Sequence, residues 1–549
     1  MSKLNGADIE LGNYVQGLHI NQPTGKMASR LLLKVIQGIE RPPDYMTRHI
    51  STYPSAKNIL AGGNCVIYSH EAALKESDHS QVSQDMGRKF LPANGGCFYI
   101  DLDHLELCLP ECLSAFDHAA CWNAMLRIVR NAMDRVNEQM PRGQKVVVLV
   151  NNSDGQSNAY GSHLNFLIGR KTFHNLFEHK LHLLLALASH QISSIVYTGQ
   201  GKVGSENRRP GVDYQISQRA DFFETIQGMQ TTFKRPIVNT RDEALAGRMN
   251  HQYSDAMHEG MARFHSIFFD NTLCHGSSLL KIGVMQIFLS MIEKEMIPSG
   301  WIFENPLSAL LQFSHDPSLE TRAKLVDGQS VTAVEHQMMI LESAKRFVDQ
   351  GYCNDAVPHV HRILELWEDT LNKLERRNFS SLTGRIDYLL KSAIIYRAFQ
   401  QDSSLQWNSP AVKRLDLTYS DLDSSRGLYW IYERAGLTEQ LVSEDDIQRF
   451  IHNPPENTRA WTRAMLLRSV SSKEIDDVDW DWISFKKTTN KYWRMTERIE
   501  LDNPLGYTRA DTEPIFQTSQ SLQELVDKFQ TLQSDLTTNE YDCSKSTKK

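Results

Sequence analysis

The chain has 549 residues, a formal net charge of −7 and a sequence pI of about 6.3. This length allows roughly two to four domains, and the acidic balance lacks the basic footprint of a nucleic-acid-binding protein. No apolar run approaches the roughly 18 residues of a membrane span, and no signal segment opens the chain, so we expect neither a nucleic-acid nor a membrane partner. Eight cysteines without paired spacing indicate free thiols and favour a cytoplasmic enzyme.

The first notable feature is an acidic pair near the N-terminus, Asp8 and Glu10. The two residues are i and i+2, so on a strand their carboxylates lie side by side. Adjacent carboxylates repel each other unless a cation sits between them, and hard oxygen ligands suit Mg²⁺ or Mn²⁺. The pair is therefore a candidate metal site, with a solvated acidic face as the alternative.

A long polar segment follows at residues 41–92, with Pro42-Pro43 and Gly62-Gly63 within it. A loop of this length inside a compact domain is usually functional or disordered. We expect it to be a mobile loop.

An alternating stretch around Asp101 predicts a strand with one apolar and one polar face, because Phe98 and Ile100 alternate with Tyr99 and Asp101. Asp is rare inside strands, so this polar face indicates a surface that handles cations or protons. Glu106 follows five residues after Asp101. The two carboxylates share a face only if the strand bulges or bends between them.

Residues 145–169 predict a hairpin with a long polar loop. Val146–Val150 is a β-branched run typical of a buried strand, and residues 151–161 are rich in turn-forming residues. The second strand places His163 and Asn165 on one face. A neutral imidazole at His163 can bind a metal, and a hydrogen-bonded core histidine is the alternative.

After about residue 270 the pattern becomes helical. Residues 276–298 show the apolar spacing of a buried helix, and residues 332–374 predict amphipathic helices whose apolar stripe packs in the core. We expect residues 1–400 to form one large domain.

The C-terminal part predicts a smaller domain over residues 405–510, which carries Trp480. Residues 538–549 are polar and are expected to be disordered.

These segments belong to a series of blocks that run in order from residue 6 to about residue 510. The blocks are Gly6–Gly12, Asn94–Asp101, His104–Leu107, Pro110-Glu111, Asn151–Gly155, Tyr160–Asn165, Thr198–Gly204, Ser217–Asp221, Arg235–Glu243, Leu415–Asp421, Arg426–Tyr429, Asn453–Ala460 and Trp480-Asp481. They resemble the family of the deamidase of Pup (depupylase) and the Pup–protein ligase, within the carboxylate–amine ligase superfamily that includes glutamine synthetase. The resemblance implies an α+β fold, in which a curved antiparallel sheet packed by helices binds ATP and Mg²⁺ on its concave face, and the small C-terminal domain completes the nucleotide site.

The resemblance also implies roles for particular residues. Asp101 occupies the position of the family's essential aspartate, which acts as a nucleophile or as the base for water. The implied metal ligands are Asp8, Glu10, Tyr99, Glu106 and His163. The implied nucleotide contacts are Trp480, which holds the base, and Arg219 and Arg241, which lie near phosphate.

Several details favour the depupylase-like branch of this family. Depupylases carry an insertion that segment 41–92 resembles in place and length, and the ligases lack it. Pro110-Glu111, Asp154-Gly155 and Gln218–Glu224 are also similar to depupylase sequence.

Several positions depart from the family pattern, Asp103 and Leu105 among them. Asp8 replaces a glutamate, Cys97 replaces an arginine that contacts ATP, and Leu109 replaces a threonine of the ligases. Leu164 and Leu11 stand where the family has a glutamate and an aromatic residue. The alternative that the chain is an ATP-independent or regulatory homologue therefore stays open.

The leading hypothesis is an amidohydrolase that cleaves the C-terminal glutamine amide of a small Pup-like modifier, or its isopeptide bond to a substrate lysine. A ligase that forms this bond through a glutamyl phosphate is the first alternative. A catalytically weakened protein that binds the modifier is the second. The resemblance implies that the modifier and its conjugates are the partners, with an indirect link to the proteasome.

Overall fold

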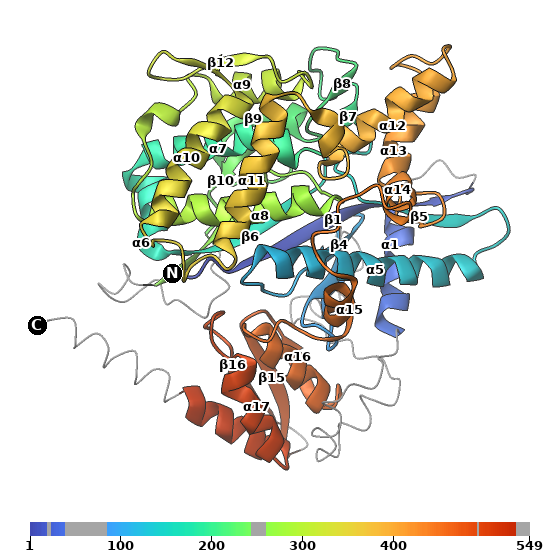
Figure 1. Cartoon of the computed structure of the whole chain (residues 1–549). Coiled ribbons are helices and arrows are strands. Elements are labelled where there is room, and N and C mark those ends of the chain that lie inside the picture. The colour runs from blue at the N-terminus through green and yellow to red at the C-terminus, as the bar shows by residue number, and fades with distance from the viewer. Residues whose placement is uncertain (19–23, 39–84, 243–259, 491–492, 534–549) are drawn as a thin grey trace, which may run out of the picture.

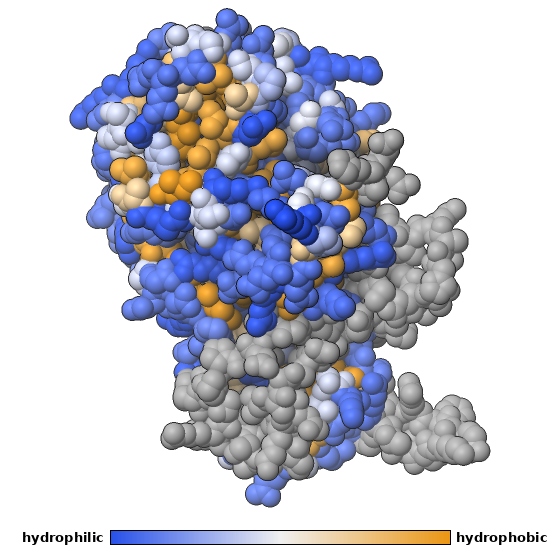
Figure 2. Space-filling model, turned by 90° about the vertical axis from the view of Figure 1, so that its right-hand side faces the viewer, coloured by the Kyte–Doolittle hydropathy of each residue, from blue (hydrophilic) through white to orange (hydrophobic). Residues whose placement is uncertain are grey.

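The computed structural model describes residues 1–18, 24–38, 85–242, 260–490 and 493–533. A large helical body surrounds one sheet, and a smaller body formed by the C-terminal elements lies against one end of that sheet (Figure 1). The face of the molecule in Figure 2 is largely hydrophilic, and apolar atoms gather in its upper half.

The main sheet contains seven of the described strands, and the pairings between them are antiparallel. Its strands are β1 (Asn5–Gln16), β2 (Asp85–Phe90), β3 (Cys97–Asp101), β4 (His104–Cys108), β5 (Lys145–Leu149), β6 (Ser162–Gly169) and β11 (Met261–Ser266). The strand order is β11-β6-β1-β4-β3-β2, with β5 paired to β1. The predicted α+β class with an antiparallel sheet is confirmed.

The predicted hairpin over residues 145–169 is wrong. β6 pairs with Asn5–Ile9 of β1 and β5 pairs with Gly12–Gln16, and the two strands do not pair with each other. Both lie on the edge of β1 opposite β4, because alternate residues of a strand direct their hydrogen bonds to opposite edges. A strand of 12 residues is long enough to hold both partners end to end.

Helices cover the sheet and build the larger hydrophobic core. They are α1 (Gly25–Gly38), α5 (Ala115–Gln139), α6 (Arg170–His174), α7 (Leu181–Thr198), α8 (His275–Glu293), α9 (Pro306–Ser314), α10 (Ala333–Asp349), α11 (Val360–Glu375), α12 (Asp387–Gln401), α13 (Pro410–Tyr419), α14 (Leu428–Arg434) and α15 (Glu444–His452). Short strands and single turns join them: β7 (Lys202–Val203), β8 (Tyr214–Gln215), β9 (Phe223–Gly228), β10 (Arg235–Asn239), β12 (Arg322–Lys324), β13 (Ser330–Thr332), η1 (Asn175–His179), η2 (Ala220–Phe222), η4 (Ser299–Trp301) and η5 (Phe379–Leu382). The helices predicted within residues 276–298 and 332–374 are confirmed as α8, α10 and α11.

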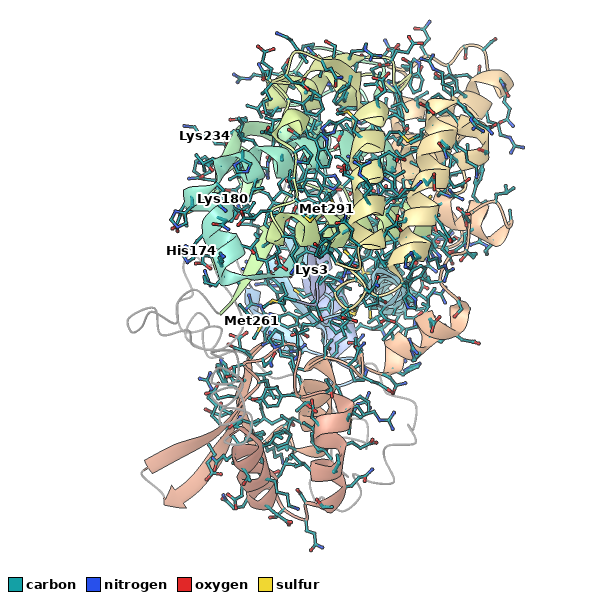
Figure 3. The ribbon with its side chains drawn as sticks, turned by 60° about the vertical axis from the view of Figure 1, so that its left-hand side comes forward. Lys3, His174, Lys180, Lys234, Met261 and Met291 are labelled. Atoms are coloured by element: carbon teal, nitrogen blue, oxygen red, sulfur yellow. The ribbon has the colours of Figure 1, made fainter. Side chains whose placement is uncertain are left out.

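Helix α8 lies at the centre of this core. It is the one helix of the described residues that is long and apolar enough to cross a membrane, whereas we expected no such stretch from the sequence. The helix is entirely buried inside the protein. The N-terminal end of β1 is fixed to it, because Nζ of the buried Lys3 lies 2.6 Å from Oε2 of Glu293. Figure 3 labels Lys3 and, on α8, Met291.

A second core forms at the C-terminus from α16 (Ala460–Ser469), β14 (Ile475–Val478), β15 (Trp482–Asn490), β16 (Trp493–Glu500) and α17 (Arg509–Thr518). Phe90, Cys97 and Cys108 of the main sheet pack into it, so the two cores meet on β2, β3 and β4.

The division between the two bodies differs from the predicted one. Helices α13, α14 and α15, which the prediction assigned to residues 405–510, bury their apolar side chains in the first core. The second core begins at Trp461 and continues to Phe529.

Two predicted segments fall mainly or wholly outside the described residues. Residues 41–84 of the predicted loop and the predicted tail at 538–549 are not among them. Residues 85–90, which the prediction placed in the loop, form β2.

Candidate active site

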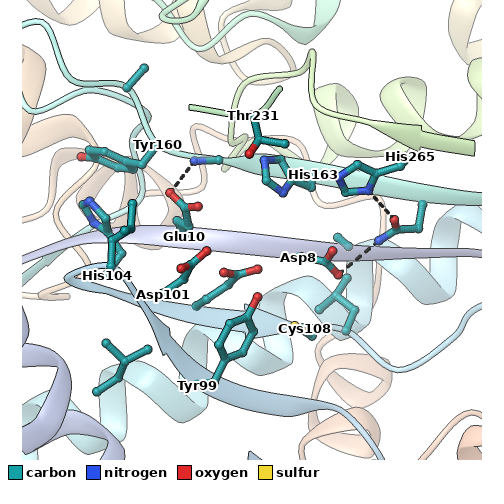
Figure 4. A pocket seen from close by; sticks show the side chains of 18 of the residues that line it. Asp8, Glu10, Tyr99, Asp101, His104, Cys108, Tyr160, His163, Thr231 and His265 are labelled. Atoms are coloured by element: carbon teal, nitrogen blue, oxygen red, sulfur yellow. Dashed lines mark hydrogen bonds between the residues drawn. The ribbon is translucent and has the colours of Figure 1, made fainter. Parts of the chain in front are cut away.

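One face of the main sheet, together with the second core, encloses a cavity of about 1350 Å³ (Figure 4). All of the predicted site residues line it: Asp8, Glu10, Tyr99, Asp101, Glu106, His163, Arg219, Arg241 and Trp480. The structure therefore brings together residues that are up to about 470 positions apart in sequence, and we call the sheet surface that lines this cavity the site face.

Strand register builds the acidic floor of the site face. Glu106 of β4 is the direct partner of Glu10 on β1 and of Tyr99 on β3. Asp101 lies two residues after Tyr99 and therefore shares its face. The bend that the sequence required is a tight β3–β4 turn at Leu102, where φ is 53°.

Three carboxylates of this floor form a compact group. Oxygen atoms of Glu10, Asp101 and Glu106 lie within 4.8 Å of one another, and no other such group of three potential metal ligands occurs among the described residues. Burial raises the pKa of Glu106 well above its ordinary value, and the charges of Glu10 and Asp8 raise it further. Burial also raises the pKa of Glu10, although His104 and a hydrogen bond of 2.7 Å from the Gly161 amide oppose this.

A cation among these carboxylates would remove the mutual repulsion that adds to burial in raising the pKa values of Glu10 and Glu106. Hard carboxylate oxygens are the donors that Mg²⁺ prefers, so the donor set fits the predicted metal. Asp8 and His163 line the same cavity but lie outside this compact group of three.

His163 and Asp8 form the neighbouring row of the sheet, where they are direct partners across β6 and β1. Burial, together with the charges of the nearby Arg219 and Arg241, lowers the pKa of His163 to about 3, so its imidazole is neutral. Asn165 lies beside them and donates a hydrogen bond of 3.1 Å to Oδ1 of Asp8.

The opposite side of Asn165 contacts two residues that sequence analysis missed. Oδ1 of Asn165 accepts hydrogen bonds from Nδ1 of His265 at 2.8 Å and from Arg263 at 3.1 Å. Both lie on β11 and line the cavity. The alternation of Arg263 and His265 with apolar residues was a usable signal in the sequence.

An aromatic brace borders the Asp101 end of the cavity (Figure 4). The ring of His104, the direct partner of Asp101, stacks on Tyr160 with 4.3 Å between centroids. Nδ1 of His104 donates to the Leu11 carbonyl at 2.9 Å, because a carbonyl can only accept. Gly12 makes room for this brace, since a Cβ there would lie 2.4 Å from Oη of Tyr160.

Arg219 lines the cavity and is also bonded to the main chain around it. Its guanidinium donates to the main-chain carbonyls of Tyr160 and, at 2.9 Å, Ile267, and its side chain is 1% exposed. These bonds fix the chain at Tyr160 and Ile267 and occupy part of the guanidinium. Arg241 also lines the cavity, and a phosphate contact of either arginine stays a prediction.

Trp480 lies at the seam between the two cores. It is packed edge-on against Phe90, with 5.1 Å between ring centroids, and Arg463 lies 4.7 Å from the centre of its ring. Arg463 also donates to the Trp480 carbonyl at 2.9 Å and to the Gly95 carbonyl at 3.0 Å. This arginine therefore ties the tryptophan to the turn before β3.

A buried ion triad completes the seam. The Glu111 carboxylate accepts from Nε of Arg459 at 2.7 Å and from Nη1 of Arg463 at 3.0 Å. Burial alone raises the pKa of Glu111, but the two arginines outweigh it and hold this pKa at about 2. Sequence analysis noted Glu111 and Arg459 only as parts of family blocks and missed their contact.

The antiparallel sheet, with carboxylates and a phenol on the face toward the cavity, agrees with the carboxylate–amine ligase-like fold that the sequence resemblance implied. Comparison with known proteins gives the family. The family model described as "Pup-ligase protein" matches residues 37–484. The chain therefore belongs to the Pup-ligase protein family, as its sequence blocks predicted.

Similar relatives carry two kinds of name. A depupylase of Acidothermus cellulolyticus is 32% identical over 83% of this chain and 86% of its own length. A Pup deamidase/depupylase of Mycolicibacterium smegmatis is 31% identical over 96% of this chain and 100% of its own length. A Pup–protein ligase of Acidimicrobium ferrooxidans is 32% identical over 70% of this chain and 81% of its own length.

Solved structures agree on the fold. The complex between the prokaryotic ubiquitin-like protein Pup and its ligase PafA matches with a TM-score of 0.71 and 22% identity, over 96% of this chain and 93% of that chain. The Pup ligase PafA in complex with ADP matches with a TM-score of 0.66 and 25% identity, over 82% of this chain and 90% of that chain.

Proposed function

We propose that this chain is an ATP- and Mg²⁺-binding Pup deamidase and depupylase. It hydrolyses the C-terminal glutamine amide of Pup or a Pup-like modifier, and the isopeptide bond between the modifier's terminal glutamate and a substrate lysine. The observation that carries this proposal is the position of Asp101 beside Glu10 and Glu106, with oxygen atoms within 4.8 Å of one another.

The residues divide into a cation-binding group and a reacting group. Glu10 and Glu106 would hold Mg²⁺, with Asp8, Tyr99 and His163 as the further ligands that the family resemblance implies. When bound, the metal supplies positive charge that neutralises nucleotide phosphates and stabilises a developing oxyanion. Carboxylate and phenol donors suit this task because they are hard oxygen ligands.

Asp101 performs the chemical step. Its carboxylate attacks the side-chain amide carbonyl, the C–N bond breaks, and the nitrogen takes a proton from water and leaves as ammonia or the lysine amine. Alternatively, the carboxylate takes a proton from the water that attacks. In the first route, water then hydrolyses the acyl-aspartate and regenerates Asp101. Either route yields a modifier that ends in glutamate, and neither requires ATP to be consumed in each turnover.

Two observations support hydrolysis over ligation. The Pup deamidase/depupylase of M. smegmatis aligns with 96% of this chain, whereas the Pup–protein ligase of A. ferrooxidans aligns with 70%. The depupylase-like sequence at Asp154-Gly155 lies in a loop that lines the cavity near Tyr160.

Ligation is the second candidate, and the ligase-named relatives at about one-third identity favour it. A ligase activates the modifier's terminal glutamate as an acyl phosphate and releases one ADP for each bond. A weakened, modifier-binding homologue is the third candidate, since Cys97 and Leu109 replace residues that contact ATP in the family pattern.

The test separates all three. The protein is incubated with ATP, Mg²⁺ and Pup ending in glutamine or in glutamate, and separately with a Pup–protein conjugate, and both protein mass and ADP are followed. We expect amide and isopeptide cleavage without stoichiometric ADP. Conjugates formed with matching ADP would establish the ligase, and binding without any mass change would establish the weakened homologue.

We further propose a cytoplasmic location and an indirect link to the proteasome through the modifier. The unpaired spacing of the cysteines supports the first, and the six cysteines among the described residues are free and buried.

A further inference from the structure

Position 97 supplies no cation to the cavity in this chain. Cys97 is fully buried, packs in the second core and is the direct partner of Cys108 across β3 and β4. It does not line the cavity, although the neighbouring Tyr99 does. The arginine that the family pattern places at this position, in contact with ATP, is therefore missing without a replacement on its own strand.

Arg88 lies on the adjacent strand β2 and lines the same cavity. The centre of its guanidinium is 5.7 Å from the centre of the Tyr99 ring. Nη1 of Arg88 is 3.7 Å from Oδ1 of Asp479, the residue before Trp480. Arg88 therefore sits between the carboxylate floor, at Tyr99, and the tryptophan at the seam.

This position suits a phosphate contact. A guanidinium carries five N–H donors in a planar fork that matches phosphate oxygens. One carboxylate oxygen at 3.7 Å is beyond ordinary hydrogen-bond distance and cannot accept them all. About one-third of the Arg88 side chain is exposed, so a ligand in the cavity can reach it.

A ligand that places its base at Trp480 and its metal at Glu106 has its phosphates between these two points. We infer that Arg88 contacts the phosphates of the bound nucleotide, in place of the arginine that the family pattern has at position 97. This inference rests on the proposed function, because it requires that the chain binds ATP.

The experiment measures affinity by titration calorimetry rather than activity. Wild type, Arg88→Met and Arg88→Lys are titrated with adenosine, AMP, ADP and ATP, in the presence of Mg²⁺. Arg498→Met is the matched control. Arg498 also lies over an aromatic ring, 4.1 Å from the centre of Trp482, and pairs with a carboxylate, Glu500 at 2.7 Å, but it does not line the cavity.

We expect Arg88→Met to weaken ATP and ADP binding about 10- to 100-fold, the range for losing a charge-assisted contact. Adenosine affinity should stay at the wild-type value. Arg88→Lys should lose less, because it keeps the charge without the fork. Arg498→Met should bind all four ligands as wild type does.

The failures are distinguishable. If wild type does not bind ATP, the proposed nucleotide site itself is wrong. If wild type binds ATP and Arg88→Met binds it equally well, the assignment of Arg88 is wrong. An equal loss for adenosine and ATP also overturns it, because Arg88 would then act through the position of Trp480. If Arg88→Met does not fold by circular dichroism, Arg88→Lys decides between the same outcomes.

Discussion

Replacing Glu111 with glutamine removes the one carboxylate that faces two buried arginines at the seam. Arg459 and Arg463 are 3% and 0% exposed, so water cannot replace the lost charge. The pKa of Glu111 falls from its ordinary 4.5 to about 2 in the folded protein. At about 1.4 kcal/mol per pKa unit, the folded environment stabilises this carboxylate by about 3 kcal/mol.

We therefore expect Glu111→Gln to lower the free energy of unfolding of the second core by about 3 kcal/mol at neutral pH. Urea denaturation of wild type and variant, followed by circular dichroism and tryptophan fluorescence, measures the difference. A charge with a depressed pKa stabilises the fold fully above its unfolded pKa. The difference should therefore be constant above about pH 5 and shrink between about pH 4.5 and pH 2.

Glu444→Gln is the matched control. Glu444 also pairs with an arginine, Arg127, but its side chain is 58% exposed, so we expect a cost below about 1 kcal/mol. The reasoning is refuted if Glu111→Gln costs no more than this control. It is also refuted if the Glu111→Gln difference stays the same at neutral pH and below about pH 4.

Four further substitutions test the site. Asp101→Asn should abolish amide and isopeptide cleavage at an unchanged melting temperature, and near wild-type cleavage would exclude Asp101 as nucleophile or base. Asp8→Ala and Glu106→Ala should weaken ATP binding only when Mg²⁺ is present; equal calorimetric affinities with and without Mg²⁺ in all three proteins would contradict a metal site. Gly12→Ala should destabilise the fold by about 1–3 kcal/mol, since its Cβ meets Oη of Tyr160, and a wild-type urea midpoint would show that the brace yields freely.

The acidic floor could be predicted from the sequence because both signals, period-two alternation and family resemblance, can be read within a single strand. Tyr99 and Asp101 share a face by alternation, and Asp8 and Glu10 do so for the same reason. Alternation alone did not show that Glu106 joins them, although the family resemblance implied it, because only the tight turn at Leu102 brings β4 alongside β3. That turn depends on the pairing of the two strands, and single-strand periodicity carries no information about it.

Contacts between distant segments were beyond sequence analysis for a related reason. The Glu111–Arg463 pair joins residues 352 positions apart, and neither residue has a periodicity that reveals its partner. The boundary of the second core was also misplaced, because α13 to α15 are amphipathic helices whose apolar face could pack on either core. Arg219 was assigned to phosphate from its block, while its burial behind Tyr160 follows only from tertiary packing.

The end-to-end placement of β5 and β6 along β1 has a consequence for how this site can change. Each strand is registered separately, β6 through the pairing of His163 with Asp8 and β5 through the pairing of Val147 with Tyr14. Residues 154–158, which lie between them, can therefore lengthen or shorten without sliding either strand. The rim of the cavity can therefore change in length while the carboxylates of the site face keep their positions.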